Sequence, residues 1–442
     1  MGTDVADTRY RAAVEDLQRR GRFGIRLGLG RTRALLRRLG NPERRLRGVL
    51  IGGTNGKGSV QALVAAVLGS QRQLVGQMPK PHLVEYRERI VIGGRPLAKE
   101  EFAAVVEQAL DAAAVVEARH GPPTEFEVLT AAAFLAFGRA SIDLLVAEVG
   151  MGGRLDATNT WQGGVSAITN VALDHTEYLG PTTSDIAREK AQIIKRGDFV
   201  ALTGADGDAL RVISARARRA GVPLRVVEPL PVLGMDRRGL RVTGPAGDEL
   251  RVGLLGAHQA ANAALALAIV DALAEAGIAP PPDPDALRSG LAEVRWPGRL
   301  ELLDGLGTDV LLDGAHNPHG AAALAAALDD LRPHLAPGRA VLMIGVLGDK
   351  DVAGMLEPLR ASAALRDARV IATTVPDSPR SLGAADLAAR WGEGAIAIDE
   401  PDAALEEALA VARRDAGPLV VCGSLYLVGH VRKLLLPTDS DA

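Results

Sequence analysis

The stretch 49–60 limits the possible folds more than any other part of this 442-residue chain, reading Val-Leu-Ile-Gly-Gly-Thr-Asn-Gly-Lys-Gly-Ser-Val. A short apolar run ends in glycines and a helix-like segment follows, so the pattern predicts a strand, a phosphate-binding loop and a helix. Glycine lets backbone N–H groups wrap phosphate oxygens, and the start of the helix adds positive charge. The alternative is a glycine-rich turn with an incidental lysine.

Within this loop, Lys57 is expected to contact the terminal phosphates of a nucleotide, and the Ser59 hydroxyl to bind magnesium. The spacing Gly-x-x-Gly-Lys-Gly-Ser is shorter than the general phosphate-loop pattern and has an additional glycine after the lysine. The predicted nucleotide-binding residues of the loop are Gly53, Thr54, Asn55, Gly56, Lys57, Gly58 and Ser59.

Composition argues against several other functions. Basic residues number 51 and acidic residues 54, so the net charge of -3 gives no global field for nucleic acid or a membrane. We interpret the locally basic segment 19–47 as a solvated or anion-facing surface. Cys422 is the single cysteine and cannot form an internal disulfide. No signal peptide is evident and the apolar stretch 260–273 is too short to span a bilayer, so we expect a cytoplasmic protein.

Strands that alternate with helices predict an α/β fold with a mostly parallel, doubly wound sheet, whose ligands lie at the carboxyl ends of the strands. The predicted strand 142–149 brings Glu148 to such an end. Short runs in 224–255 indicate a small antiparallel portion. The alternation restarts after 295–299, which predicts two domains, 1–298 and a smaller 299–442.

Several motifs in order resemble the folylpolyglutamate synthase/dihydrofolate synthase family. They are Gly-Thr-Asn-Gly-Lys-Gly-Ser at 53–59, Pro-His-Leu-Val at 81–84, Glu-Val-Gly-Met-Gly-Gly-Arg-Leu-Asp-Ala-Thr-Asn at 148–159, Leu-Asp-His-Thr at 173–176, Arg-Glu-Lys-Ala at 188–191, Trp-Pro-Gly-Arg at 296–299, Asp-Gly-Ala-His-Asn-Pro-His at 313–319 and Gly-Ser-Leu-Tyr-Leu-Val-Gly at 423–429. The resemblance spans almost the whole chain.

That family belongs to the Mur-type ATP-dependent amide ligases. The resemblance implies an ATP-binding domain followed by a Rossmann-like C-terminal domain, with the reaction in the cleft between them. It also implies that ATP phosphorylates the carboxylate of a folate or dihydropteroate, and that the amine of L-glutamate attacks the resulting acyl phosphate. The expected partners are therefore small molecules, and the family-based expectation for the oligomeric state is a monomer.

The resemblance also assigns roles in catalysis and in binding two magnesium ions. Ser59 and Glu148 would hold the first ion and His175 the second, while Lys190 would carry a carbamate that approaches the metal. From the residues alone, His175 would more often be structural and Lys190 an exposed helix lysine. The implied catalytic residues are Lys57, His175, Lys190 and His316.

Further nucleotide contacts are implied outside the loop. His258 and Asn262 match the family's adenine-contacting helix start, and Arg299 and Asp313 match residues that reach ATP from the linker and the second domain. His316 matches a position near the transferred phosphate. The alternatives are a helix cap with a buried polar pair for 258 and 262, and a turn-capping histidine for 316.

The acceptor side is assigned by resemblance in the same way, with Thr124, Phe126, Glu127 and Thr130 on the pterin side. Without the resemblance, this segment would be an ordinary buried helix. The residues assigned to the substrate are Lys80, His82, Thr124, Phe126, Glu127, Thr130, Arg154 and Asp156.

Lys80 departs from the family pattern, which usually has serine or threonine before Pro81-His82 as a ligand of the first magnesium. An ammonium group cannot ligate a metal, so Lys80 either turns away or places its charge against the phosphates. The change leaves two alternatives open: a ligase of the same fold with a different carboxylate acceptor, and a catalytically silent nucleotide-binding protein.

Overall fold

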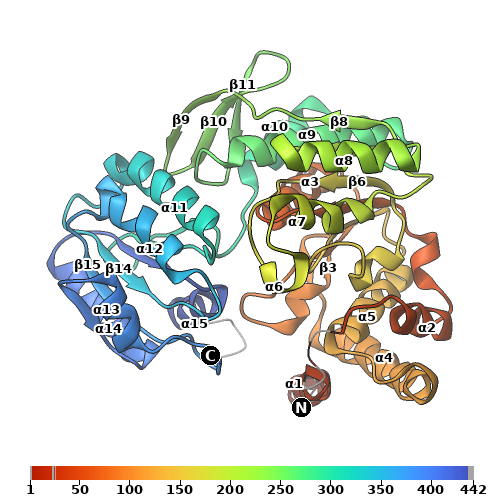
Figure 1. Cartoon of the computed structure of the whole chain (residues 1–442), viewed down its shortest axis with the longest axis horizontal. Helices are drawn as coiled ribbons and strands as arrows, with labels where there is room; N and C mark the ends of the chain where they lie inside the picture. The colour runs from red at the N-terminus through yellow and green to blue at the C-terminus, as the bar shows by residue number, and fades with distance from the viewer. Residues whose placement is uncertain (1, 22–23, 25, 437–442) are drawn as a thin grey trace. The chain divides into compact units, whose positions relative to one another are not determined.

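The chain folds into two compact units, shown in the computed structural model of Figure 1, which describes residues 2–21, 24 and 26–436. The first unit comprises Met1–Pro229 and Ala261–Leu291, and the second comprises Leu230–Ala260 and Ala292–Ala442. This division differs from the expected boundary after residue 298, because the segment 230–260 belongs to the second unit. Leu255 from that segment is buried in the same core as Leu300, and Met235 packs against it.

The first unit is built on an eight-stranded sheet of order β4-β3-β2-β5-β1-β6-β7-β8. All pairs among β2, β5, β1, β6, β7 and β8 are parallel, while β3 and β4 add an antiparallel edge. The central strand β1 is buried along its whole length, which explains its apolar sequence. The strands are β1 Gly48–Gly52, β2 Val75–Met78, β3 Val91–Ile92, β4 Arg95–Pro96, β5 Leu144–Glu148, β6 Gly164–Ile168, β7 Val200–Thr203 and β8 Leu224–Val226.

Helices of the first unit pack together with the sheet in one hydrophobic core. Leu50 of β1, Leu145 and Ala147 of β5 share this core with side chains of α1, α2, α4 and α5. The helices of the unit are α1 Gly2–Gly21, α2 Gly30–Arg38, α3 Lys57–Ser70, α4 Lys99–His120, α5 Glu125–Ala140, α6 Thr176–Leu179, α7 Thr183–Lys190, α8 Gly207–Ala220, α9 Gln259–Glu275 and α10 Pro284–Glu293.

The second unit contains a small antiparallel sheet and a six-stranded sheet of order β12-β13-β17-β14-β15-β16. The larger sheet is parallel except for β12, which pairs antiparallel with β13. Helices α11 and α12 lie side by side (Figure 1). The strands are β9 Val232–Asp236, β10 Gly239–Thr243, β11 Glu249–Val252, β12 Glu301–Leu303, β13 Val310–Leu312, β14 Val341–Ile344, β15 Arg369–Ala372, β16 Ala395–Ala397 and β17 Leu419–Cys422; the helices are α11 Pro318–Leu331, α12 Val352–Ala361, α13 Ala384–Trp391, α14 Pro401–Arg414 and α15 Leu425–Leu435.

The predicted α/β class, the mostly parallel sheets and the small antiparallel portion are confirmed. In the described part of the chain, no helix combines the length and the apolar character needed to cross a membrane.

Candidate active site

The glycine-rich loop follows the central strand β1 and leads into α3. Gly53 has φ 138° and Gly56, the N-cap of α3, has φ 82°. A Cβ atom at Gly53 would overlap the Thr169 hydroxyl, and one at Gly56 would overlap the Asn262 side-chain oxygen. Both positions therefore need glycine for backbone conformation and for space.

Residues after β6 hold this loop in place. Thr54 N donates to Asn170 O (2.9 Å), and Asn55 N donates to Asn170 Oδ1 (3.0 Å). The Thr169 hydroxyl donates to Asn55 O (2.6 Å). Thr169 and Asn170 are absent from the predicted site, because their place beside the loop depends on β6 lying next to β1.

Two lysines converge on the loop carbonyls. Lys57 Nζ donates to Gly53 O (3.1 Å) and Thr54 O (2.9 Å), and Lys190 Nζ donates to Gly53 O (2.8 Å). Lys190 is buried at the end of α7. The alternative of an exposed helix lysine is therefore wrong. Burial, together with the charge of Lys57, lowers the pKa of Lys190 to about 7.

The first magnesium position was assigned to Ser59 and Glu148. Glu148 is buried at the end of β5, in register with Ile51 of β1, and Ser59 is buried in the first turn of α3. A carboxylate and a hydroxyl are oxygen ligands of the kind that magnesium prefers. The described residues contain no group of three or more His, Cys, Asp or Glu side chains suited to a metal, so phosphate oxygens would have to complete the shell. The residues present fit a nucleotide-bound ion.

His175 lies before α6 with φ 49°, and 41% of its side chain is exposed. Its Nε2 is 3.8 Å from Asp174 Oδ2. The charge of Asp174 raises the pKa of Lys190, partly opposing the effect of burial. Asp174 is therefore part of the electrostatic environment of the loop lysines, a role that the sequence did not suggest.

Lys80 does not turn toward solvent. Its Nζ is buried and lies 4.2 Å from the centroid of the Phe126 ring, while its backbone N–H donates to Glu148 Oε1. Burial lowers the pKa of Lys80 to about 8, although the charges of Asp156 and Glu148 oppose this shift. Lys80, Phe126, Glu148 and Asp156 are thus brought together.

His82 is locked by neighbouring side chains. Arg89 Nε donates to His82 Nδ1 (2.8 Å), and the His82 ring lies 4.3 Å from the Tyr86 ring between centroids. Burial, with the charge of Arg89, lowers the pKa of His82 to about 3, so the ring is neutral at ordinary pH.

Asp156 organises the glycine-rich segment after β5. Its Oδ2 accepts from Gly150 N (2.9 Å) and Met151 N (3.0 Å), and its Oδ1 accepts from Thr158 N (3.0 Å). Arg154 has an exposed ion pair with Glu189 (3.0 Å).

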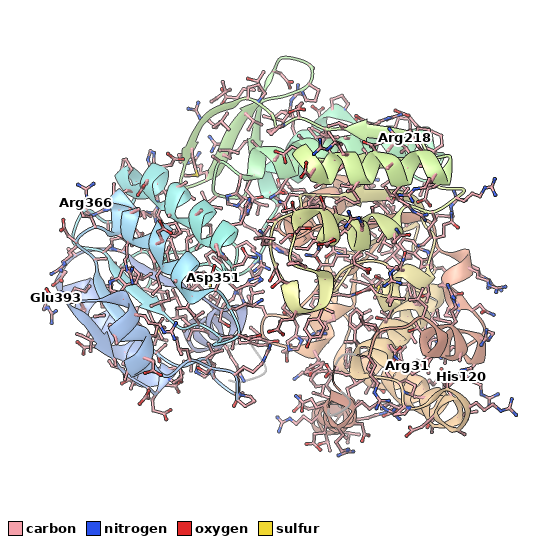
Figure 2. All side chains as sticks on the ribbon, viewed as in Figure 1. Arg31, His120, Arg218, Asp351, Arg366 and Glu393 are labelled. Carbon is pink, nitrogen blue, oxygen red and sulfur yellow. The ribbon has the colours of Figure 1, made fainter. Side chains whose placement is uncertain are left out.

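Thr124 and Glu127 form a capping box at the start of α5. The Thr124 hydroxyl accepts from Glu127 N (3.3 Å), and Glu127 Oε2 accepts from Thr124 N (2.8 Å). Arg31, labelled in Figure 2, adds an ion pair to Glu127 (2.9 Å). Thr130 is buried in the same helix. These contacts give Thr124 and Glu127 a structural role, and their role toward substrate stays a prediction.

The predicted residues of the second unit surround the loop after β13. Asp313 is partly buried and accepts from Leu300 N (2.9 Å) and Ala315 N (2.9 Å). Desolvation raises its pKa against the opposing charge of Arg299. Arg299 Nη1 donates to Gly298 O (3.1 Å), and His316 Nδ1 lies 2.8 Å from Gly314 O. These contacts of Asp313, Arg299 and His316 are all with residues of the second unit.

His258 and Asn262 do not share one helix. The helix α9 begins at Gln259, so His258 lies in the preceding turn and only Asn262 lies on the helix. Asn262 borders Gly56 in the first unit and is therefore part of the phosphate-loop environment.

Comparison with known proteins agrees with this geometry. Residues 51–228 match the Mur ligase middle domain, and residues 298–425 match the Mur ligase, glutamate ligase domain. The dihydrofolate synthase/folylpolyglutamate synthase of Bacillus subtilis is 33% identical over 97% of this chain and 99% of the relative.

Solved structures show the same similarity over nearly the full length. A Mycobacterium tuberculosis folylpolyglutamate synthase complexed with ADP has a TM-score of 0.86 and 34% identity, covering 98% of this chain and 99% of that one. E. coli FolC in complex with DHPP and ADP has a TM-score of 0.81 and 29% identity, covering 96% and 97%. The chain therefore belongs to the dihydrofolate synthase/folylpolyglutamate synthase family of Mur-type ligases.

Proposed function

We propose that this protein uses ATP to join L-glutamate to the carboxylate of a folate or of dihydropteroate, through an acyl phosphate. The main support is the phosphate loop with two lysines at its carbonyls and Glu148 at the end of the neighbouring strand. The near full-length similarity to dihydrofolate and folylpolyglutamate synthases supports the choice of substrates.

In this proposal the protein acts mainly by positioning and by charge neutralisation. The backbone of 53–59 binds the phosphates, and Lys57 neutralises negative charge on the terminal phosphate as it is transferred. The acceptor carboxylate attacks that phosphate, ADP leaves, and the amine of L-glutamate then displaces phosphate from the acyl carbon. The Arg299, Asp313 and His316 cluster is assigned to nucleotide and phosphate contacts, as the resemblance implies.

Ser59 and Glu148 would hold a magnesium ion that neutralises phosphate charge, and His175 with a carbamylated Lys190 would hold a second one. The environment of Lys190 supports the modification, because only a neutral amine reacts with carbon dioxide and burial favours that form. The carbamate can be sought by 13C NMR after incubation with 13C-labelled bicarbonate, with Lys190→Met as the control.

The test is phosphate release from MgATP and L-glutamate, with dihydropteroate or tetrahydrofolate as acceptor and product masses as confirmation. Turnover with dihydropteroate assigns folate synthesis, and turnover with tetrahydrofolate assigns extension of the glutamate chain. Phosphate release that does not require an acceptor would contradict the proposal, and ATP binding without turnover would indicate a silent nucleotide-binding protein.

A ligase with a different carboxylate acceptor is the second candidate, and the observation that favours it is Lys80. This residue replaces the expected hydroxyl and is buried against Phe126, a residue assigned to the acceptor side. This alternative would be established if neither dihydropteroate nor tetrahydrofolate supported turnover and another carboxylic acid did.

A further inference from the structure

Lys80 carries a buried positive charge that no described residue satisfies with a hydrogen bond. Among the described residues, none accepts a hydrogen bond from Lys80 Nζ. Water would normally satisfy all three N–H donors of an ammonium group, so burial without a partner destabilises the folded state. A group of this kind beside a phosphate loop points to a ligand that supplies the missing anion.

The neighbours of Lys80 explain why the charge is tolerated but not why it is there. The Phe126 ring, 4.2 Å away, gives a cation–π contact. The carboxylates of Glu148 and Asp156 attract the charge from a distance. Glu148 Oε1 instead accepts a hydrogen bond from the backbone N–H of Lys80, and Asp156 accepts from the groups that order the segment after β5.

The other cations near this position already have partners inside the protein. Lys57 and Lys190 donate to carbonyl groups of the phosphate loop, and Arg89 donates to His82. Lys80 therefore differs from its neighbours in having its donors unused by the described residues.

The proposed reaction brings two anions together, the acceptor carboxylate and the terminal phosphate of ATP. A carboxylate oxygen forms a bond to the phosphorus while the bond from phosphorus to the ADP oxygen breaks, and the electron pair leaves with ADP. We propose that the Lys80 ammonium binds the reacting carboxylate of the acceptor beside the Phe126 ring, and so reduces the repulsion between the two anions.

This inference rests on the proposed function and makes Lys80 a residue that determines which acceptors bind. An acceptor without a carboxylate at the reacting position would lose its main attraction to this side of the site. The reacting carboxylate forms a charge-assisted hydrogen bond with the ammonium in a dry environment, where such a bond is strong.

The test is equilibrium binding of two probes to wild type, Lys80→Met and Lys80→Arg, in the absence of ATP. One probe is whichever of dihydropteroate and tetrahydrofolate the wild type glutamylates, and the other is its analogue with hydrogen in place of the reacting carboxylate. We expect the Lys80→Met substitution to raise the Kd of the carboxylate probe roughly tenfold or more. The analogue should bind to both proteins equally, and Lys80→Arg should restore part of the affinity.

Thermal stability is a second readout. If Lys80 had a structural role, its removal would lower the thermal midpoint. Removal of an unpaired buried charge should leave the thermal midpoint of ligand-free Lys80→Met at or above that of wild type. Lys195→Met is the matched control, because Lys195 is also largely buried but its Nζ donates to Trp161 O. That variant should lose the hydrogen bond to Trp161 and keep acceptor affinity.

Equal loss of affinity for both probes would overturn the proposal, because it would show that Lys80 maintains the shape of the site and does not bind the carboxylate. Unchanged acceptor affinity with weakened MgADP binding would overturn it in favour of a role toward the nucleotide. If wild type glutamylates neither acceptor, the proposed function fails first, whereas a wild type that is active and a Lys80→Met variant that binds normally refute only this inference.

Discussion

The phosphate loop and the Lys80–Phe126 region lie in the same unit but satisfy their polar groups in different ways. In the loop, Thr54, Asn55 and Lys57 have hydrogen-bond partners within the protein, and Lys190 donates to a loop carbonyl. Beside it, the ammonium of Lys80 has an aromatic ring but no hydrogen-bond acceptor among the described residues. The first region is organised before any ligand binds, and the second is completed by the ligand. We expect substitutions to act differently in the two regions.

The largest effect is expected for Lys57→Met. The ammonium would be lost from a loop that the remaining hydrogen bonds still hold, so the fold should persist while charge neutralisation is lost. We expect kcat to fall by about a hundredfold to a thousandfold, as for removal of one transition-state donor. Acceptor-dependent phosphate release measures the change.

Lys350→Met is the control for Lys57→Met, because Lys350 lies in the loop before α12 of the second unit and has no predicted role. A Lys57→Met variant with more than a tenth of wild-type turnover would show that the loop backbone and the metal carry most of the catalysis, and would contradict the assigned role.

The contrast between the regions also explains what could be predicted from the sequence. Gly53, Gly56 and Lys57 were identifiable because a local motif specifies both conformation and chemistry. The contacts from Thr169 and Asn170 were not, because they depend on β6 lying next to β1, and sequence patterns do not give strand order. The local sequence pattern alone did not indicate that Lys190 is buried, because a lysine in a polar helix segment normally faces solvent.

The fold shows the same limit. The apolar strand expected at 142–149 is β5, Leu144–Glu148. The sequence places the segment 230–260 in the first domain because it precedes the boundary motif, yet Leu255 of this segment is buried with Leu300. Tertiary packing decided the assignment, and a single sequence does not reveal it.

The second prediction concerns Gly56→Ala. This residue has φ 82°, and the new Cβ would overlap Asn262 Oδ1. We expect about 2–3 kcal/mol of destabilisation from backbone strain and overlap, together with weaker nucleotide binding. Chemical denaturation and ADP titration measure the two effects.

Two further variants separate the causes. Asn262→Ala in the same chain should relieve the overlap but not the backbone strain, so it should recover only part of the stability. Gly69→Ala, at an open position of α3, should be neutral or stabilising by about 1 kcal/mol. A Gly56→Ala variant as stable as wild type would refute the rigid-loop account.

A smaller effect is expected for Glu127→Ala, next to Phe126. The change removes the capping box with Thr124 and the ion pair with Arg31, while the partners stay largely buried. We expect a loss of about 2 kcal/mol in the free energy of unfolding. The KM for the acceptor should change little if the residue is structural.

Thr124→Ala is the partner variant, and it should lose about 1 kcal/mol because only the cap is affected. If Glu127→Ala instead raises the acceptor KM tenfold at unchanged stability, Glu127 contacts the substrate, and the Phe126 region is more open to ligand than the hydrogen bonds indicate.

The smallest effect concerns Lys195, which tests the cost of a buried lysine that has a partner. Burial lowers the pKa of Lys195 to about 8 from 10.5, so between these values the unfolded chain binds more protons than the folded one. The contribution of Lys195 to stability therefore rises with pH across this window and is least favourable below it. Comparing the free energy of unfolding at pH 7 and pH 9, we expect wild type to gain about 1 kcal/mol relative to Lys195→Met. If the free energies of unfolding of wild type and Lys195→Met change with pH in parallel, the ammonium of Lys195 is effectively solvated. The comparison of Lys195 with Lys80 would then rest on hydrogen bonding alone.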